Sequence, residues 1–171
     1  MKKLALLTLV TALAGCGSDS PTSPTTGPIV FTAALSAANE VPPVTNADAN
    51  ARGTATMTLN VPRDSSGAPT GPGTMNFVIQ LSGFPAATTL VGAHIHPGAA
   101  GVNGGVIVNT GLSAASPIAS LGDGSGTLTF SDIAVSLANA QAINSNPAGH
   151  YFNVHSQINT AGAVRGQLVK Q

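Results

Sequence analysis

Histidine carries the clearest chemical signal in this sequence of 171 residues, which holds four histidines and a single cysteine. His94 and His96 stand one residue apart in the segment AHIHPGAAGVNGG, and His155 follows in HYFNVHSQ. On a β-strand, residues two apart project from the same face, so His94 and His96 point together, opposite Ala93 and Ile95. If the two segments lie side by side, His94, His96 and His155 converge. Three imidazoles with an open fourth position suit zinc or copper.

A structural role for the same histidines stays open. A histidine beside the turn PGAAGVNGG can donate a ring N–H to a backbone carbonyl and hold that turn without any metal. The two interpretations differ in geometry, because converging rings favour a metal site and splayed rings favour a scaffold. His150 falls outside this pattern, and we expect it at the surface.

Cys16 has a different chemistry. The N-terminal segment MKKLALLTLVTALAGC has two lysines, a short apolar run and small residues before the cysteine, which is typical of an export signal over residues 1–15. Its end, LAGC, resembles the bacterial lipobox, in which the cysteine receives fatty acyl chains such as palmitate. We therefore expect an exported lipoprotein that is held at the membrane through the lipid on Cys16. Gly17 and Ser18 lack the aspartate that retains such proteins at the inner membrane, which favours the outer membrane.

Glu40 and Arg165 stand out because only 7% of the residues are charged. Glu40 precedes the rigid pair Pro42-Pro43, and a guanidinium group offers a planar fork for a carboxylate. We predict a partly buried ion pair between Glu40 and Arg165 that joins the first and last strands. Two solvated charges at the rim of the domain are the alternative.

Several function classes lack support in the sequence. The formal net charge is zero and no basic run follows Lys3, so nucleic acid is not an expected partner. No Ser-His-Asp arrangement, pair of close carboxylates or phosphate-binding glycine loop is specified. The sequence therefore favours a non-enzymatic protein.

The elements that must position these residues are short strands. Residues 16–28 contain the cysteine and a proline-rich tether, and from residue 29 to 171 the apolar residues recur with a period of two. About eight strands are predicted, separated by clusters such as PRDSSGAPTGPG. One segment, SDIAVSLANAQAINSNP, has Ile133, Leu137 and Ala140 at helical spacing and predicts a short helix that Pro147 ends. We expect an all-β antiparallel sandwich or barrel.

Three blocks resemble the CHRD domain, first described in chordin: FTAALSAANEVPPV (31–44), GAHIHPGAAGVNGGVIV (92–108) and YFNVHSQINTAGAVRGQL (151–168). Their order and spacing match, and the resemblance covers nearly all of the chain after the tether. It implies an immunoglobulin-like β fold and no established reaction.

Together, these features predict a lipid-anchored binding or structural module of the cell envelope, with an envelope or extracellular protein as a possible partner. A copper- or zinc-binding protein that uses the three histidines is the alternative, and surface adhesion is a third.

Overall fold

The computed structural model describes residues 27–116 and 118–171. The expected signal peptide, Cys16 and all of the tether except residues 27 and 28 lie outside the described residues. The strands of the described part are β1 (Ile29–Ser36), β2 (Arg52–Asn60), β3 (Gly73–Ser82), β4 (Thr88–Pro97), β5 (Val108–Asn109), β6 (Ser120–Leu121), β7 (Gly126–Val135), β8 (His150–Ser156), β9 (Val164–Gln167) and β10 (Val169–Lys170). The helices are η1 (Ala37–Asn39), α1 (Leu137–Ser145) and η2 (Pro147–Gly149).

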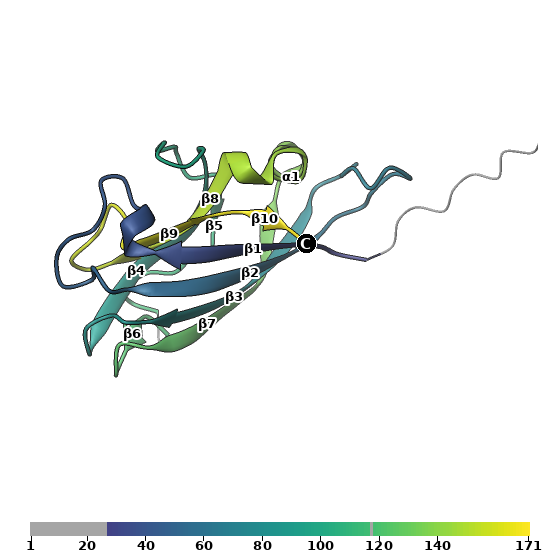
Figure 1. The fold of residues 1–171 in the computed structure, drawn as a ribbon. Helices are drawn as coiled ribbons and strands as arrows, with labels where there is room; N and C mark the ends of the chain where they lie inside the picture. Colours follow the sequence, from purple (N-terminus) through teal and green to yellow (C-terminus); the bar gives the residue numbers. More distant parts are fainter. Residues whose placement is uncertain (1–26, 117) are drawn as a thin grey trace, which may run out of the picture.

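The strands form one antiparallel sheet. Its order is β5-β4-β8-β9-β1-β2-β3-β7, while β6 pairs with β4 and β10 pairs with β1. The two ends of this order, β5 and β7, contact each other, so the sheet curls into a nearly closed barrel (Figure 1). This arrangement confirms the predicted all-β antiparallel sandwich or barrel with a short helix.

The apolar core fills the inside of the barrel. In β1, β2 and β3 alternate residues are buried, as the period of two predicts. The rings of Phe77 and Phe152 meet there with their centroids 5.7 Å apart. Each fully buried side chain of this size stabilises the fold by about 1.5–3 kcal/mol, so the core holds the strands in place.

The α-helix begins later than the sequence pattern predicted. We expected helical structure from Ile133 onward, but β7 continues through that residue, which pairs with Met75 of β3. Cross-strand packing outweighs local helical spacing here. α1 starts only after Ser136, whose side-chain oxygen accepts a hydrogen bond from the backbone N–H of Asn139. None of the helices in the described residues has the length and apolar character needed to cross a membrane.

A bulge changes the expected alternation in β4. Strict alternation would place Val91 on the core face with Ala93 and Ile95. The pairing of β4 with β8 shifts between Leu90 and Gly92, so Leu90 enters the core and Val91 is only half-buried. From Gly92 onward the expected faces hold, which leaves His94 and His96 on the outer side of the barrel.

A second buried layer lies outside the barrel, over β4, β8 and β9. Every residue of β8 is buried, although only Phe152 and Val154 belong to the apolar core. The outward side chains of β8 are therefore covered as well. The segments that cover them, called the covering loops below, are residues 37–51, 98–107 and 157–163. Figure 1 shows the first and third of these loops next to each other at one end of the barrel.

Candidate metal site

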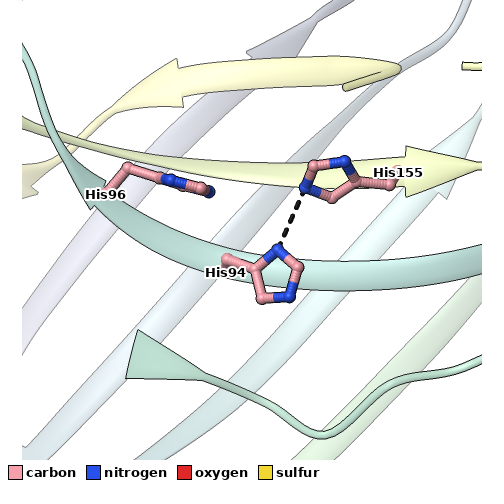
Figure 2. Close-up of side chains that lie close together, drawn as sticks. All are labelled: His94, His96 and His155. Carbon is pink, nitrogen blue, oxygen red and sulfur yellow. Dashed lines mark hydrogen bonds between the residues drawn. The ribbon is translucent and has the colours of Figure 1, made fainter. Parts of the chain in front are cut away.

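The three predicted histidines come together on the outer face of β4 and β8. In the register of these strands, His155 lies opposite Gly92, and His94 lies opposite Asn153. One ring nitrogen from each of the three histidines lies within 4.8 Å of the others. Figure 2 shows the three rings on the same side of the paired strands, with His94 and His155 joined by a hydrogen bond.

The hydrogen bonds determine which nitrogen of each ring carries a proton. The Thr160 carbonyl oxygen, 2.9 Å from His155 Nδ1, can only accept, so Nδ1 donates and Nε2 of His155 keeps its lone pair. His94 Nδ1, 3.0 Å from that Nε2, must then be the donor. A hydrogen atom thus lies between these two nitrogens, and it would have to leave His94 Nδ1 before that nitrogen could hold a metal ion.

His96 is bonded on both sides of its ring. Its Nδ1 lies 3.0 Å from the carbonyl oxygen of Gly104 and its Nε2 lies 3.0 Å from Asn153 Oδ1. The structure therefore combines the two geometries that the sequence left open, since the rings converge and two of them also hold backbone carbonyls. These geometries are compatible, because histidines that bind metals commonly donate their second N–H to a carbonyl.

Burial keeps the three rings neutral. Desolvation, followed by the proximity of His155 and His96, lowers the pKa of His94 to about 4. Desolvation also lowers the pKa values of His96 and His155, against the opposing effect of their carbonyl hydrogen bonds. Near neutral pH the cluster is therefore uncharged, the form in which imidazole binds metals.

Gly92 makes room for the paired rings. A Cβ atom at this position would lie 2.8 Å from Cε1 of His94 and 3.4 Å from Cδ2 of His155. The first distance is shorter than van der Waals contact allows, so any larger residue would displace the His94 ring.

Arg165 and Tyr151 support the cluster from β9 and β8. The Tyr151 ring stacks on His96 with centroids 4.8 Å apart, and the guanidinium carbon of Arg165 lies 3.4 Å from the Tyr151 centroid. Arg165, only 1% exposed, donates hydrogen bonds to the carbonyls of Ala99 and Val102 and to Asn103 Oδ1. It therefore fixes the same covering loop whose Gly104 carbonyl holds His96.

The comparison with known families agrees with this architecture. Residues 31–168 match the CHRD domain. The chain belongs to the CHRD domain family. The match contains all three blocks whose resemblance the sequence indicated. A search of curated proteins finds no match to this chain.

Glu40 of the CHRD domain was predicted to form a partly buried ion pair with Arg165. Glu40 and Arg165 are both buried, at 6% and 1% exposed, but Arg165 directs its hydrogen bonds to the covering loop. Within the described residues, Glu40 Oε1 has no hydrogen-bond partner. Burial raises the pKa of Glu40 to about 7, while the Arg165 charge and the Asn153 amide lower it by less. The two charged groups thus interact through space.

His150 is buried, although we expected it at the surface. It is 7% exposed rather than at the surface, and its Nδ1 donates to the Asn146 carbonyl oxygen over 2.8 Å. It begins β8 and lies apart from the histidine cluster. Tyr151 and Asn153, in contrast, belong to the site although neither was predicted as a site residue. Asn153 and Tyr151 lie two and four residues before His155, and this period of two is the sequence signal that could have identified them.

Replacing Gly92 by alanine is expected to separate His94 from His155. The added Cβ displaces the His94 ring, which should cost about 1–3 kcal/mol in free energy of unfolding. Denaturant unfolding measures this cost, and ring ¹⁵N NMR reports the loss of the His94–His155 hydrogen bond. Gly105→Ala is the control, because a Cβ there meets no atom within 4 Å. Equal stabilities and unchanged ring signals in the two variants would contradict the role of Gly92.

Replacing Glu40 by glutamine is expected to stabilise the protein more at high pH than at low pH. The pKa of Glu40 rises from 4.5 to about 7 on folding, so the folded chain binds the proton more tightly and loses stability as the pH rises through this range. A glutamine side chain does not titrate, so the free energy of unfolding of Glu40→Gln relative to wild type should increase by about 1–3 kcal/mol between about pH 5 and pH 8.

The through-space interaction of Glu40 with Arg165 is tested by a double-mutant cycle on unfolding. Glu40→Ala, Arg165→Ala and the double variant should lose less stability together than the sum of the single losses. Additive losses would show that the two residues are independent, and a pH-independent effect of Glu40→Gln would show that Glu40 does not titrate in this range.

Proposed function

We propose that this CHRD domain is a metal-binding module of the cell envelope, in which His94, His96 and His155 hold a copper or zinc ion. The observation that carries the proposal is the convergence of three neutral imidazoles within 4.8 Å on two paired strands. Imidazole nitrogen suits both metals, and three protein ligands leave one position for water or another ligand.

The spacing of His94 and His155 supports this proposal. Their facing nitrogens are 3.0 Å apart, close to the separation of about 3.3 Å that two nitrogens have on a tetrahedral zinc ion with bonds of about 2.0 Å. The carbonyl of Thr160 holds His155 by its other nitrogen. Such a bond fixes the ring and makes the free nitrogen a better ligand.

A metal-free binding or structural module is the second candidate. It is favoured by the bonds of His96 and His155 to carbonyls of two different covering loops. In that function the histidines would shape a surface for an envelope or extracellular protein partner. The partly exposed threonine row of β2, formed by Thr54, Thr56 and Thr58, would suit a role in adhesion.

We further propose that the domain is attached to the membrane through a lipid on Cys16, in the outer membrane of a bacterial envelope. The support is the N-terminal sequence, with its apolar run and the residues LAGC. In this function the membrane is a partner through the lipid alone.

Metal content tests the main proposal. The full chain, purified in detergent, is exposed to copper or zinc, dialysed and analysed by mass spectrometry. We expect about one equivalent per chain for wild type and at least a tenfold lower content for His94→Ala and His96→Ala. His150→Ala is the matched control, because His150 is also buried and bonded to a carbonyl but lies outside the cluster.

No retained metal in wild type, together with lower thermal stability of His94→Ala and His96→Ala, would contradict metal binding and favour the scaffold. Equal metal loss in His150→Ala would show that the variants act through misfolding.

Replacing Cys16 by alanine tests the anchor. Labelled palmitate should be incorporated into wild type, which has no other cysteine, and not into Cys16→Ala. Wild type should also sediment with the outer membrane. An unlabelled wild-type chain in the soluble fraction would contradict lipid attachment.

A further inference from the structure

His96 differs from the other two histidines in its position. The ring centroids of His94 and His155 are 4.9 Å apart, whereas His96 lies 5.6 Å from His94 and 6.3 Å from His155. His94 and His155 are therefore already arranged as a pair. His96 must move inward before all three nitrogens reach one ion.

Asn153 is the residue that holds His96 away from the pair. Its side chain is 2% exposed and its Oδ1 lies 3.0 Å from His96 Nε2, while the Gly104 carbonyl occupies Nδ1. The Gly104 carbonyl can only accept, so Nδ1 carries the single hydrogen of the neutral ring and Nε2 keeps its lone pair. The Asn153 amide, turned so that its NH₂ group faces Nε2, donates to that lone pair. The Nε2 lone pair is therefore not free for a metal.

We propose that Asn153 sets the affinity of the histidine site, because its amide competes with the metal ion for Nε2 of His96. This inference rests on the proposed metal-binding function and deepens it. The ion is first held by His94 and His155, and His96 joins only when Asn153 releases it. The site is therefore suited to a copper or zinc ion that exchanges, as in metal uptake or transfer, and less to a permanently bound ion.

Glu40 is a second partner of the Asn153 amide. Its Oε1 atom is buried without a hydrogen-bond partner among the described residues, and the Asn153 amide is one of the groups that act on this carboxyl. The amide therefore keeps Glu40 as a partner when His96 leaves, instead of remaining buried and unpaired. The buried carboxylate therefore lowers the free energy needed to move His96 onto the metal.

The direction in which the metal affinity changes distinguishes a residue that competes with the metal from one that only orients a ligand. Removing a residue that merely orients a metal ligand typically weakens metal binding by about 10–100-fold. Removing a competitor strengthens it. We expect Asn153→Ala to lower the dissociation constants of Zn²⁺ and Cu²⁺ by about tenfold or more, measured by competition with a chelating dye on the purified full chain.

Two further variants test whether the gain in metal affinity depends on His96. The gain should disappear in His96→Ala/Asn153→Ala, because no Nε2 remains to be released. Ser156→Ala is the matched control for a buried polar residue of β8, since Ser156 bonds to Asp48 rather than to a histidine. It should leave both dissociation constants within about twofold of wild type.

Asn153→Leu, which keeps the side-chain volume without hydrogen bonding, replaces Asn153→Ala if the latter does not fold. In parallel, ring ¹⁵N NMR should show zinc coordination at His96 Nε2 at a lower zinc concentration in the variant than in wild type. Both results would support competition by Asn153.

The outcomes distinguish this inference from the proposed function. If wild type binds metal and the Asn153 variants bind equally or more weakly, competition is wrong and the metal site stands. If wild type does not retain metal but an Asn153 variant does so through His96, the proposed function of the wild-type chain is wrong and competition by Asn153 is supported. If neither binds either ion, the metal site and the competition are both wrong.

Discussion

The register of β4 against β8 is the constraint on which the rest of the site depends. Both faces of β8 are buried, so a slip of one residue would bring its polar side chains into the barrel and Phe152 out of it. The same register places Gly92 opposite His155, and thereby gives the His94 ring the space it needs. The apolar core thus determines the histidine geometry, although the three clustered histidines lie outside that core.

The covering loops bury the outward side chains of β8, which would otherwise lie on the surface of the barrel. Polar groups buried there must find partners, because an unpaired buried group costs about 1–3 kcal/mol. Arg165 meets this requirement with hydrogen bonds to Asn103 and two carbonyls and by stacking on Tyr151. Glu40 does not, since one of its oxygens has no partner in the described part of the chain.

Much of this arrangement could be predicted from the sequence, because it follows from alternation. The period of two placed His94 and His96 on one face, and the three CHRD-like blocks indicated the family. Convergence itself remained conditional, because no local pattern states which strands are neighbours. The pairing of β4 with β8 joins segments about 60 residues apart.

The remaining features depend on loops and irregularities that alternation does not contain. The bulge beside Leu90 and the continuation of β7 through Ile133 arise from cross-strand pairing. Arg165 directs its hydrogen bonds to the loop at residues 98–104, and alternation does not indicate those acceptors. We expected His150 at the surface because alternation does not indicate its acceptor, which is a carbonyl in the turn after α1.

The distance along the chain between the two strands also determines when the histidine site can exist. His94 and His155 are 61 positions apart, so an unfolded chain does not present them together. The three histidines come together only when β8 pairs with β4, which is a non-local contact. If the chain is exported unfolded, as we propose, it carries no such site in transit, and an ion bound afterwards would come from the compartment in which the chain folds.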